Sequence, residues 1–178
     1  LLGPRSPQWL GVSQYRTVLA DPPWCERGGG KIKRGADRHY SVLKTPQIVA
    51  LMQAQLDART IAPDAHMYLW VTNNFLADGM LVMRELGFTY KTNIVWAKHR
   101  SGLGQYFRGQ HELCLFGVRG SGYAVRKESR SLTTLLGKGI LKRDKRHSAK
   151  PNEMYELIEE RSHGPYLELF ARNTRDNW

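Results

Sequence analysis

The chain has 178 residues, of which 41% are hydrophobic, so it is long enough to form one globular domain with a substantial core. Its 27 lysines and arginines against 16 aspartates and glutamates result in a net charge of +11, which favours a polyanionic partner such as nucleic acid. The sequence shows neither an apolar run of membrane-spanning length nor a signal-peptide pattern, and its two cysteines cannot form a disulfide framework, so we expect a cytoplasmic protein.

The pattern of apolar residues and of helix and strand breakers predicts a single α/β domain over 15–178, preceded by a flexible lead-in over 1–14. Thr45 is suited to cap a helix, with Pro46 at the first helical position. Strands alternate with helices, which favours a mostly parallel sheet with helices packed on it. We expect strands at 15–20, 66–71, 89–96, 111–118 and 166–170, a brief strand at 123–125, and helices at 45–58, 75–86 and 151–161.

The tetrapeptide Asp21-Pro22-Pro23-Trp24 directly follows the first predicted strand. Proline has no N–H to donate to a sheet, so the chain must leave the sheet here, at the edge where open α/β sheets bind their ligands. The two prolines stiffen the loop and turn neighbouring carbonyl groups into fixed acceptors beside the Asp21 carboxylate. Trp24 adds either a flat surface for a ligand or a core contact. The loop therefore predicts a site for a planar ring that carries an amino group.

Two clusters of basic residues accompany glycine-containing loops, and one of them lies next to the predicted site. Runs of charge are often only solvated surface, but two such clusters favour contacts with phosphate groups. The first cluster comprises Arg27, Lys31, Lys33, Arg34 and Arg38, and the second comprises Lys138, Lys142, Arg143, Lys145, Arg146 and Lys150.

Several short segments, spread over residues 15–178, resemble one known family and occur in its order. They are Leu19–Trp24, His39-Tyr40, Leu69–Thr72, Ile94–Trp96, Gly109–Glu112, His147–Pro151 and Leu167–Arg172. With these segments the chain resembles the MT-A-type adenine-N6 methyltransferases. The resemblance implies a Rossmann-like methyltransferase sandwich in a permuted order, with the catalytic strand first and the cofactor strand last. It also implies S-adenosylmethionine as the methyl donor.

The resemblance assigns the catalytic loop to Asp21, Pro22, Pro23 and Trp24. The N6 nitrogen of adenine is a poor nucleophile, because its lone pair is delocalised into the ring. The Asp21 carboxylate and the Pro22 carbonyl would accept hydrogen bonds from both N6 hydrogens and direct the lone pair at the methyl group. Trp24 or Tyr40 would stack on the base.

The resemblance also implies ligands for the cofactor and the substrate. Lys150 would bind the methionyl carboxylate of the cofactor and Phe170 its adenosine, with Asp21 nearby. Arg172 and Asn173 would reach its hydroxyl and carboxylate groups. Glu168 has either a structural or a ligand role. For the nucleic acid we expect contacts from Tyr40, Arg34, Arg38, Lys98, Arg146 and His147.

Three histidines, His39, His111 and His147, lack neighbouring ligands at regular spacing, so we expect no metal site. Residues 1–14 contain no acidic residue, whereas longer family members carry one that contacts the cofactor adenine. The sequence also ends at Trp178, before a polar stretch that relatives have. Either those residues lie outside this sequence or the cofactor site is less complete, so the contacts on the adenosine side of the cofactor stay open.

Three functions remain open at this point. The first is methylation of adenine N6, with DNA favoured over RNA because the short chain shows no added RNA-binding domain. The second is nucleic-acid binding without catalysis, and the third is methylation of an amide or a small molecule. A homodimer or a heterodimer with a related subunit is possible, and we expect residues 98–122 to supply its surface.

Overall fold

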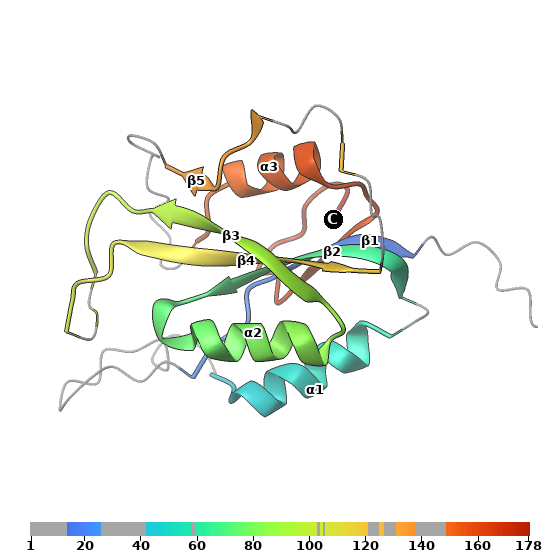
Figure 1. Ribbon diagram of the computed structural model, residues 1–178, viewed down its shortest axis with the longest axis horizontal. Coiled ribbons are helices and arrows are strands. Elements are labelled where there is room, and N and C mark those ends of the chain that lie inside the picture. Colours follow the sequence, from blue (N-terminus) through green and yellow to red (C-terminus); the bar gives the residue numbers. More distant parts are fainter. Residues whose placement is uncertain are drawn as a thin grey trace, which may run out of the picture.

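Six strands form one sheet in the order β5-β3-β4-β2-β1-β6 (Figure 1). The computed structural model describes residues 14–25, 42–57, 60–102, 104, 106–120, 125–126, 131–137 and 149–178. Among the described strands β4 alone runs against the others, so the prediction of a mostly parallel sheet is confirmed. The strands are β1 (Tyr15–Ala20), β2 (Ile61–Val71), β3 (Thr89–Ala97), β4 (His111–Arg119), β5 (Leu135–Leu136) and β6 (Tyr166–Leu169).

Helices cover both faces of the sheet (Figure 1). Helices α1 (Thr45–Gln55) and α2 (Leu76–Glu85) lie on one face, and α3 (Glu153–Arg161) lies on the other. A 3₁₀ turn, η2 (Asn73–Phe75), leads into α2. No helix in the described part of the chain is long and apolar enough to cross a membrane.

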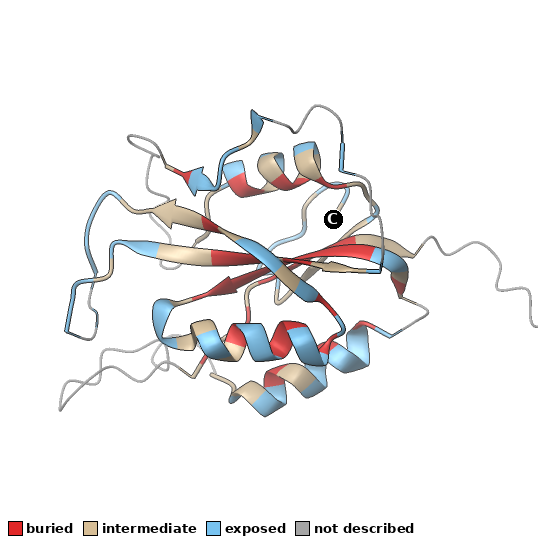
Figure 2. Ribbon diagram, in the orientation of Figure 1, coloured by how far each residue is buried: buried red, intermediate tan, exposed pale blue. Residues whose placement is uncertain are grey.

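The alternation of side chains along the strands creates two cores, one on each face of the sheet. In β1, Val18 and Ala20 pack toward α1 and α2, whereas Leu19 packs toward α3. In β2, Met67 and Leu69 belong to the first core, and Trp70 belongs to the second. Figure 2 shows the buried residues in the middle of the sheet and on the inner faces of the helices. This packing holds the carboxyl ends of β1 and β2 rigidly in place.

Several predicted boundaries need correction. Lys44 is the N-cap of α1, one residue before the predicted Thr45, and its N–H donates to the Gln47 side chain at 2.9 Å. Along α1, Ile48, Met52 and Leu56 are buried as their spacing predicted, but Leu51 is 49% exposed. The helix ends at Gln55, and α3 begins at Glu153, not at Pro151.

Strand β2 begins at Ile61, five residues before the predicted start at His66. Pro63 hid this extension, because proline inside a strand argues against it. The structure accommodates Pro63 where the β1–β2 register shifts between Tyr15 and Thr17. The predicted brief strand at 123–125 is not seen at Val125, and 123–124 lie outside the described residues. The short strand β5 instead pairs in parallel with Val95 and Trp96 of β3.

The first and last strands are direct neighbours, with Ala20 opposite Leu169. This adjacency is what a permuted order with the catalytic strand first would require, and the permutation itself stays a prediction. So does the division into a lead-in and one domain, since residues 1–13 lie outside the described residues.

Candidate active site

The loop after β1 lies at the edge of the sheet where β6 also ends. The Asp21 N–H is 3.5 Å from the Leu169 carbonyl oxygen, the last contact between the two strands. Because β4 is antiparallel, its first residues reach this same edge, beside the end of β3. The site therefore draws residues from the ends of β1, β3 and β6 and from the start of β4.

Hydrogen bonds hold the loop after β1 in one shape. The Pro22 carbonyl accepts from the Trp24 N–H at 2.8 Å, and the Pro23 carbonyl accepts from the Leu43 N–H at 2.8 Å. A carbonyl oxygen has two lone pairs, and the bond from Trp24 occupies one of those on the Pro22 oxygen. These bonds fix the backbone of the loop, and the role of the Pro22 carbonyl as an acceptor for a ligand stays a prediction.

Trp24 anchors this loop in the core. Its ring is 5% exposed, it lies 5.5 Å from the Phe75 ring in a stacked arrangement, and its Nε1–H donates to the Trp70 carbonyl at 2.9 Å. This burial corrects the prediction that Trp24 offers its ring to a base. Of the two aromatic residues considered for stacking, Tyr40 is left, and it lies outside the described residues.

Lys150 connects the loop to the rest of the site. Its Nζ donates to both carboxylate oxygens of Asp21 at 2.8 Å and lies 3.5 Å from Glu112 Oε2. The ammonium also sits 5.4 Å from the centre of the Trp70 ring. Lys98 forms a short ion pair with Glu112 from the other side. Two carboxylates and two ammonium groups thus alternate in one chain of contacts.

The charges of this chain stabilise one another. Burial alone would lower the pKa of Lys150, but the carboxylates of Asp21 and Glu112 outweigh it and raise that pKa. Burial would raise the pKa of Glu112, yet Lys150 and Lys98 lower it overall. Lys150 is therefore charged at neutral pH, and Asp21 receives a fixed positive partner.

Glu112 is the residue of the site to which the sequence alone assigned no role. It belongs to the segment Gly109–Glu112, but its position depends on β4 being antiparallel. In that register Glu112 pairs with Trp96 at the end of β3, and so faces Lys98 and Lys150. A hairpin reading of 89–118 would have placed it at this edge.

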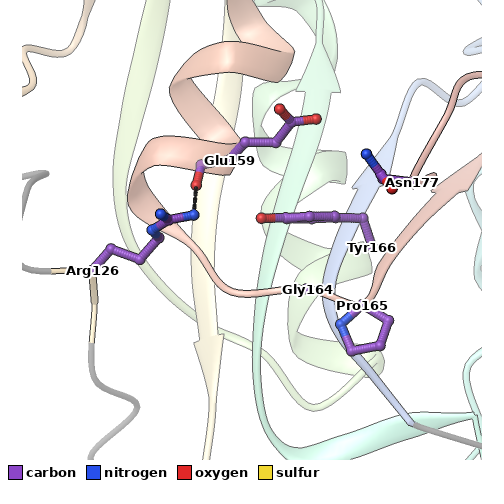
Figure 3. A pocket seen from close by; sticks show the side chains of 6 residues that line it. All are labelled: Arg126, Glu159, Gly164, Pro165, Tyr166 and Asn177. Carbon is purple, nitrogen blue, oxygen red and sulfur yellow. Dashed lines mark hydrogen bonds between the residues drawn. The ribbon is translucent and has the colours of Figure 1, made fainter.

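A cavity of about 530 Å³ lies at the opposite edge of the sheet, at the start of β6 (Figure 3). There the Arg126 guanidinium donates to the Glu159 carbonyl at 3.0 Å, and the Tyr166 ring faces the space between them and Pro165. It does not adjoin Asp21, which lies beyond the other end of the strands. Within the described residues, no group of three or more His, Cys, Asp or Glu side chains could hold a metal ion.

The family model MT-A70 matches residues 15–178. The chain belongs to the MT-A70 family. The chain is 30% identical to the Type II methyltransferase M.MunI from a Mycoplasma species, over 95% of this chain and 78% of that protein. It is 28% identical to a putative N(6)-adenosine-methyltransferase MT-A70-like protein of Medicago truncatula, over 97% of this chain and 28% of that one. It is 27% identical to the human N(6)-adenosine-methyltransferase catalytic subunit METTL3, over 97% of this chain and 30% of that protein.

The chain thus spans under a third of the length of the plant and human relatives and most of the length of M.MunI. MT-A70 proteins are adenine-N6 methyltransferases that depend on S-adenosylmethionine, which confirms the family resemblance. That cofactor combines a sulfonium cation, an ammonium group, a carboxylate and an adenosine.

The tip of β6 suits such a ligand in two respects. A pocket of about 290 Å³ lies between α1 and the tip, lined by Leu51, Met52, Gln55, Glu168, Leu169 and Phe170. The Glu168 carboxylate is close enough to Asp21 for the Asp21 charge to add to burial in raising the pKa of Glu168. Two neighbouring carboxylates favour a cation between or beside them.

Although both residues line this pocket, the side chains of Phe170 and Glu168 make their contacts on different faces of the sheet. Phe170 has a φ of 64° and packs against the core on the α1 face. Glu168 accepts a hydrogen bond from the Tyr155 hydroxyl of α3 at 2.9 Å. The left-handed backbone at Phe170 breaks the strand alternation that would have kept the two side chains together. Glu168 thus has a structural contact and a position near Asp21 at once.

Of the remaining predicted site residues, the structure describes Arg172, Asn173 and Lys98. Arg172 and Asn173 are exposed just after β6. The Lys98 ammonium forms an ion pair with Glu112 and lies 5.0 Å from the centre of the Trp96 ring. Four of the predicted substrate contacts, like Tyr40, lie outside the described residues: Arg34, Arg38, Arg146 and His147.

Proposed function

We propose that this protein transfers a methyl group to N6 of adenine in nucleic acid, with DNA as the favoured substrate. The observation that carries the proposal is the Asp21 carboxylate, fixed by Lys150 at 2.8 Å, next to a Pro22 carbonyl with one unused lone pair. These two acceptors stand at the tip of β1, beside the tip of β6.

The two acceptors match the two hydrogens of the N6 amino group. Asp21 accepts from one N–H and Pro22 from the other, which draws the nitrogen out of conjugation with the ring and makes its lone pair available. The lone pair forms the new N–C bond as the C–S bond breaks, and the electron pair of that bond stays on sulfur. The methylated nitrogen then releases a proton. Asp21 orients the amine in this scheme whether it or water accepts the proton.

S-adenosylmethionine, when bound, supplies a methyl group activated by its sulfonium charge. Phe170 would hold the adenosine at the pocket beside α1, and Asp21 and Glu168 would face the cationic groups. Arg172 and Asn173 would reach hydroxyl and carboxylate oxygens. Lys150 would contact the carboxylate of the cofactor by giving up one of its contacts to Asp21 or Glu112, because its three N–H bonds already face three carboxylate oxygens.

The choice of DNA is supported by the similarity to M.MunI, which is named a Type II methyltransferase and is 30% identical over 95% of this chain. Tyr40, Arg34, Arg38, Lys98, Arg146 and His147 would contact the nucleic acid, and reaching a base in a duplex would require flipping it out.

The proposal is tested by incubating the protein with labelled S-adenosylmethionine and either DNA or RNA, followed by mass spectrometry of the nucleosides. We expect N6-methyladenine, with higher turnover on DNA. Asp21→Ala should reduce transfer at least about 1000-fold, since it removes an electrostatic contact to the reacting group, and should leave nucleic-acid affinity nearly unchanged.

Each outcome bears on one part of the proposal. Higher turnover on RNA would overturn the choice of substrate. Full activity in Asp21→Ala would refute the assigned site. Tight nucleic-acid binding without methyl transfer or cofactor binding would favour a non-catalytic member of the family.

A further inference from the structure

We propose that Tyr106 and Phe107, at the tip of the connection between β3 and β4, stack on nucleobases that flank the target adenine. This inference rests on the proposed function, because it treats nucleic acid as the substrate. The connection leaves the sheet at the active-site edge and projects from it at the left of Figure 1. It would therefore lie beside any strand whose adenine reaches Asp21.

The two rings are unusual in their exposure. Tyr106 is 102% exposed and Phe107 is 86% exposed, whereas the other exposed large hydrophobic residues of the described chain are between 37% and 49% exposed. Tyr106 also has a φ of 61°, a left-handed conformation that is strained for a bulky residue. Neither the burial of apolar surface nor a backbone preference explains an aromatic residue at this position. A ligand that stacks on the ring would explain it.

The backbone of the connection is closely packed. The Lys98 N–H donates to the Gln110 carbonyl at 2.8 Å, and the Gly102 N–H donates to the Gly109 carbonyl at 2.7 Å. A Cβ at Gly104 would overlap the Phe107 carbonyl oxygen and the Gly109 nitrogen, so only glycine allows this tight turn. The fold of the backbone therefore presents the two rings outward.

The charge of the connection selects the occupant. Between Lys98 and His111 the sequence has three lysines and arginines, two histidines and no acidic residue. Basic and aromatic residues together suit single-stranded or flipped-out nucleic acid, where the bases stack on rings and the phosphates meet the cations. A second copy of this chain would bring the same positive charge to the surface and be repelled.

The first residue of the connection, Lys98, is linked to Asp21 through a chain of ion pairs. The distance from Asp21 to the two rings is therefore limited by the length of the connection. Lys98 contacts Glu112, Glu112 contacts Lys150, and Lys150 contacts Asp21. Phe107 lies three residues before Gln110, and three extended residues span about 10 Å at most. Nucleotides along a strand are about 3.4 Å apart. The rings would therefore meet bases within a few positions of the target.

The experiment combines two protein variants with a scan of the substrate. The double variant Y106S/F107S and the wild type are titrated by fluorescence anisotropy with an adenine-containing oligonucleotide, at one fixed salt concentration. The flanking bases are replaced one at a time by abasic residues. We expect the variant to lose about tenfold in affinity for each ring removed. The wild type should lose affinity at one or two abasic positions, and the variant should be insensitive at those positions.

Control variants separate stacking from folding. Y106F and F107Y keep the rings and should retain the affinity, and M80S changes an exposed residue of α2 and should bind like the wild type. Equal affinity of the double variant, or the same abasic profile as the wild type, would overturn the inference. The inference would also be overturned if the double variant kept the wild-type affinity for the oligonucleotide but differed from the wild type in molar mass by light scattering. That result would assign the rings to an interface between copies of the chain. Absence of methyl transfer in the wild type would refute the proposed function instead, since binding is measured independently.

Discussion

At the scale of single residues, Lys150 fixes the charge and the orientation of Asp21 in the loop after β1. It is 15% exposed at its side chain and contacts two carboxylates, Asp21 and Glu112. If its charge were lost, these two carboxylates would lie near each other with only Lys98 to compensate. A half-buried ion pair contributes little to stability by itself, but it determines orientation and charge where the chemistry occurs.

Replacing Lys150 should therefore act mainly on turnover. We expect Lys150→Met to lower kcat about 100-fold, because Asp21 loses its fixed partner. Lys98→Met, which removes the more exposed contact to Glu112, should have a smaller effect. Steady-state kinetics with varied S-adenosylmethionine are the measurement. A rise in the KM for S-adenosylmethionine with unchanged kcat would show that Lys150 serves cofactor binding and not Asp21.

His66 is a second residue whose environment has a measurable consequence. It is 1% exposed, and its Nδ1 lies 2.7 Å from the Ser162 hydroxyl, which also contacts the Tyr68 hydroxyl at 2.8 Å. Burial, together with the positive charges of Arg161, His163 and Arg16, lowers the pKa of His66 to about 3. The folded protein therefore keeps this ring neutral where the unfolded chain would protonate it.

The stability should depend on pH for this reason. The unfolded chain binds the proton below about pH 6.5, and the folded protein binds it only near pH 3. As the pH is lowered from about 6.5 to about 3, the free energy of unfolding should therefore fall by up to about 1.4 kcal/mol per pH unit. Urea unfolding at a series of pH values tests this, with His66→Asn expected to reduce the slope and the exposed His111→Asn expected to leave it unchanged. An unchanged slope in His66→Asn would contradict the assignment.

At the scale of elements, the close approach of α2 to the sheet positions the end of β2. A Cβ at Gly79 would lie 2.5 Å from Val71 Cγ1 and 3.0 Å from Leu115 Cδ1. The helix can approach β2 and β4 this closely because Gly79 has no side chain. Val71 is the last residue of β2, so this contact lies directly behind the active-site edge.

Gly79→Ala should be destabilising although alanine favours helices. The helix propensity would stabilise by about 1 kcal/mol, and overpacking would cost about 1–3 kcal/mol. We expect a net loss in the free energy of unfolding, measured by urea titration. Met80→Ala, at an exposed position of the same helix, should change little. A more stable Gly79→Ala variant would mean that the helix can move away from the sheet at no cost.

At the scale of the whole molecule, the net charge of +11 and the active-site edge act together. The sheet brings four chain segments to one edge, and the surplus of positive charge attracts the phosphate backbone to the protein. Under the proposed function, the charge would supply affinity without sequence preference, and the geometry at Asp21 would select the base.

Nucleic-acid binding should accordingly weaken steeply with salt. We expect the logarithm of the association constant to fall with the logarithm of the salt concentration. The slope should be about −3 or steeper, which corresponds to three or more phosphate contacts. Anisotropy titrations between about 50 and 200 mM salt measure it. The binding of S-adenosylmethionine over the same range serves as the control. A slope shallower than about −1 would show that phosphate contacts contribute little.

The sequence alone was sufficient for most of the longer elements and for the position of the loop after β1. Strand β1 has the predicted bounds, because its apolar run ends in two prolines that cannot continue a ladder. Helix α2 ends before Gly87, whose φ is 78° as a terminating glycine requires. Asp21 and Pro22 lie where the sequence placed them, since a strand end followed by a rigid turn is a local property of the chain. The family resemblance was readable for the same reason.

The tertiary structure decided which distant residues meet. Local patterns could not show that β4 is antiparallel, and this direction alone brings Glu112 to Lys98 and Lys150. Nor could they show that Trp24 is buried against Phe75, or that Phe170 turns away from Glu168 through a left-handed backbone. Periodicity reports which face of its own element a residue occupies, whereas contacts between elements depend on the register and direction of strands far apart in sequence. The residue types and the rigid turn of the loop after β1 are therefore set by the local sequence. The charges that surround Asp21 are set by the packing of the whole sheet.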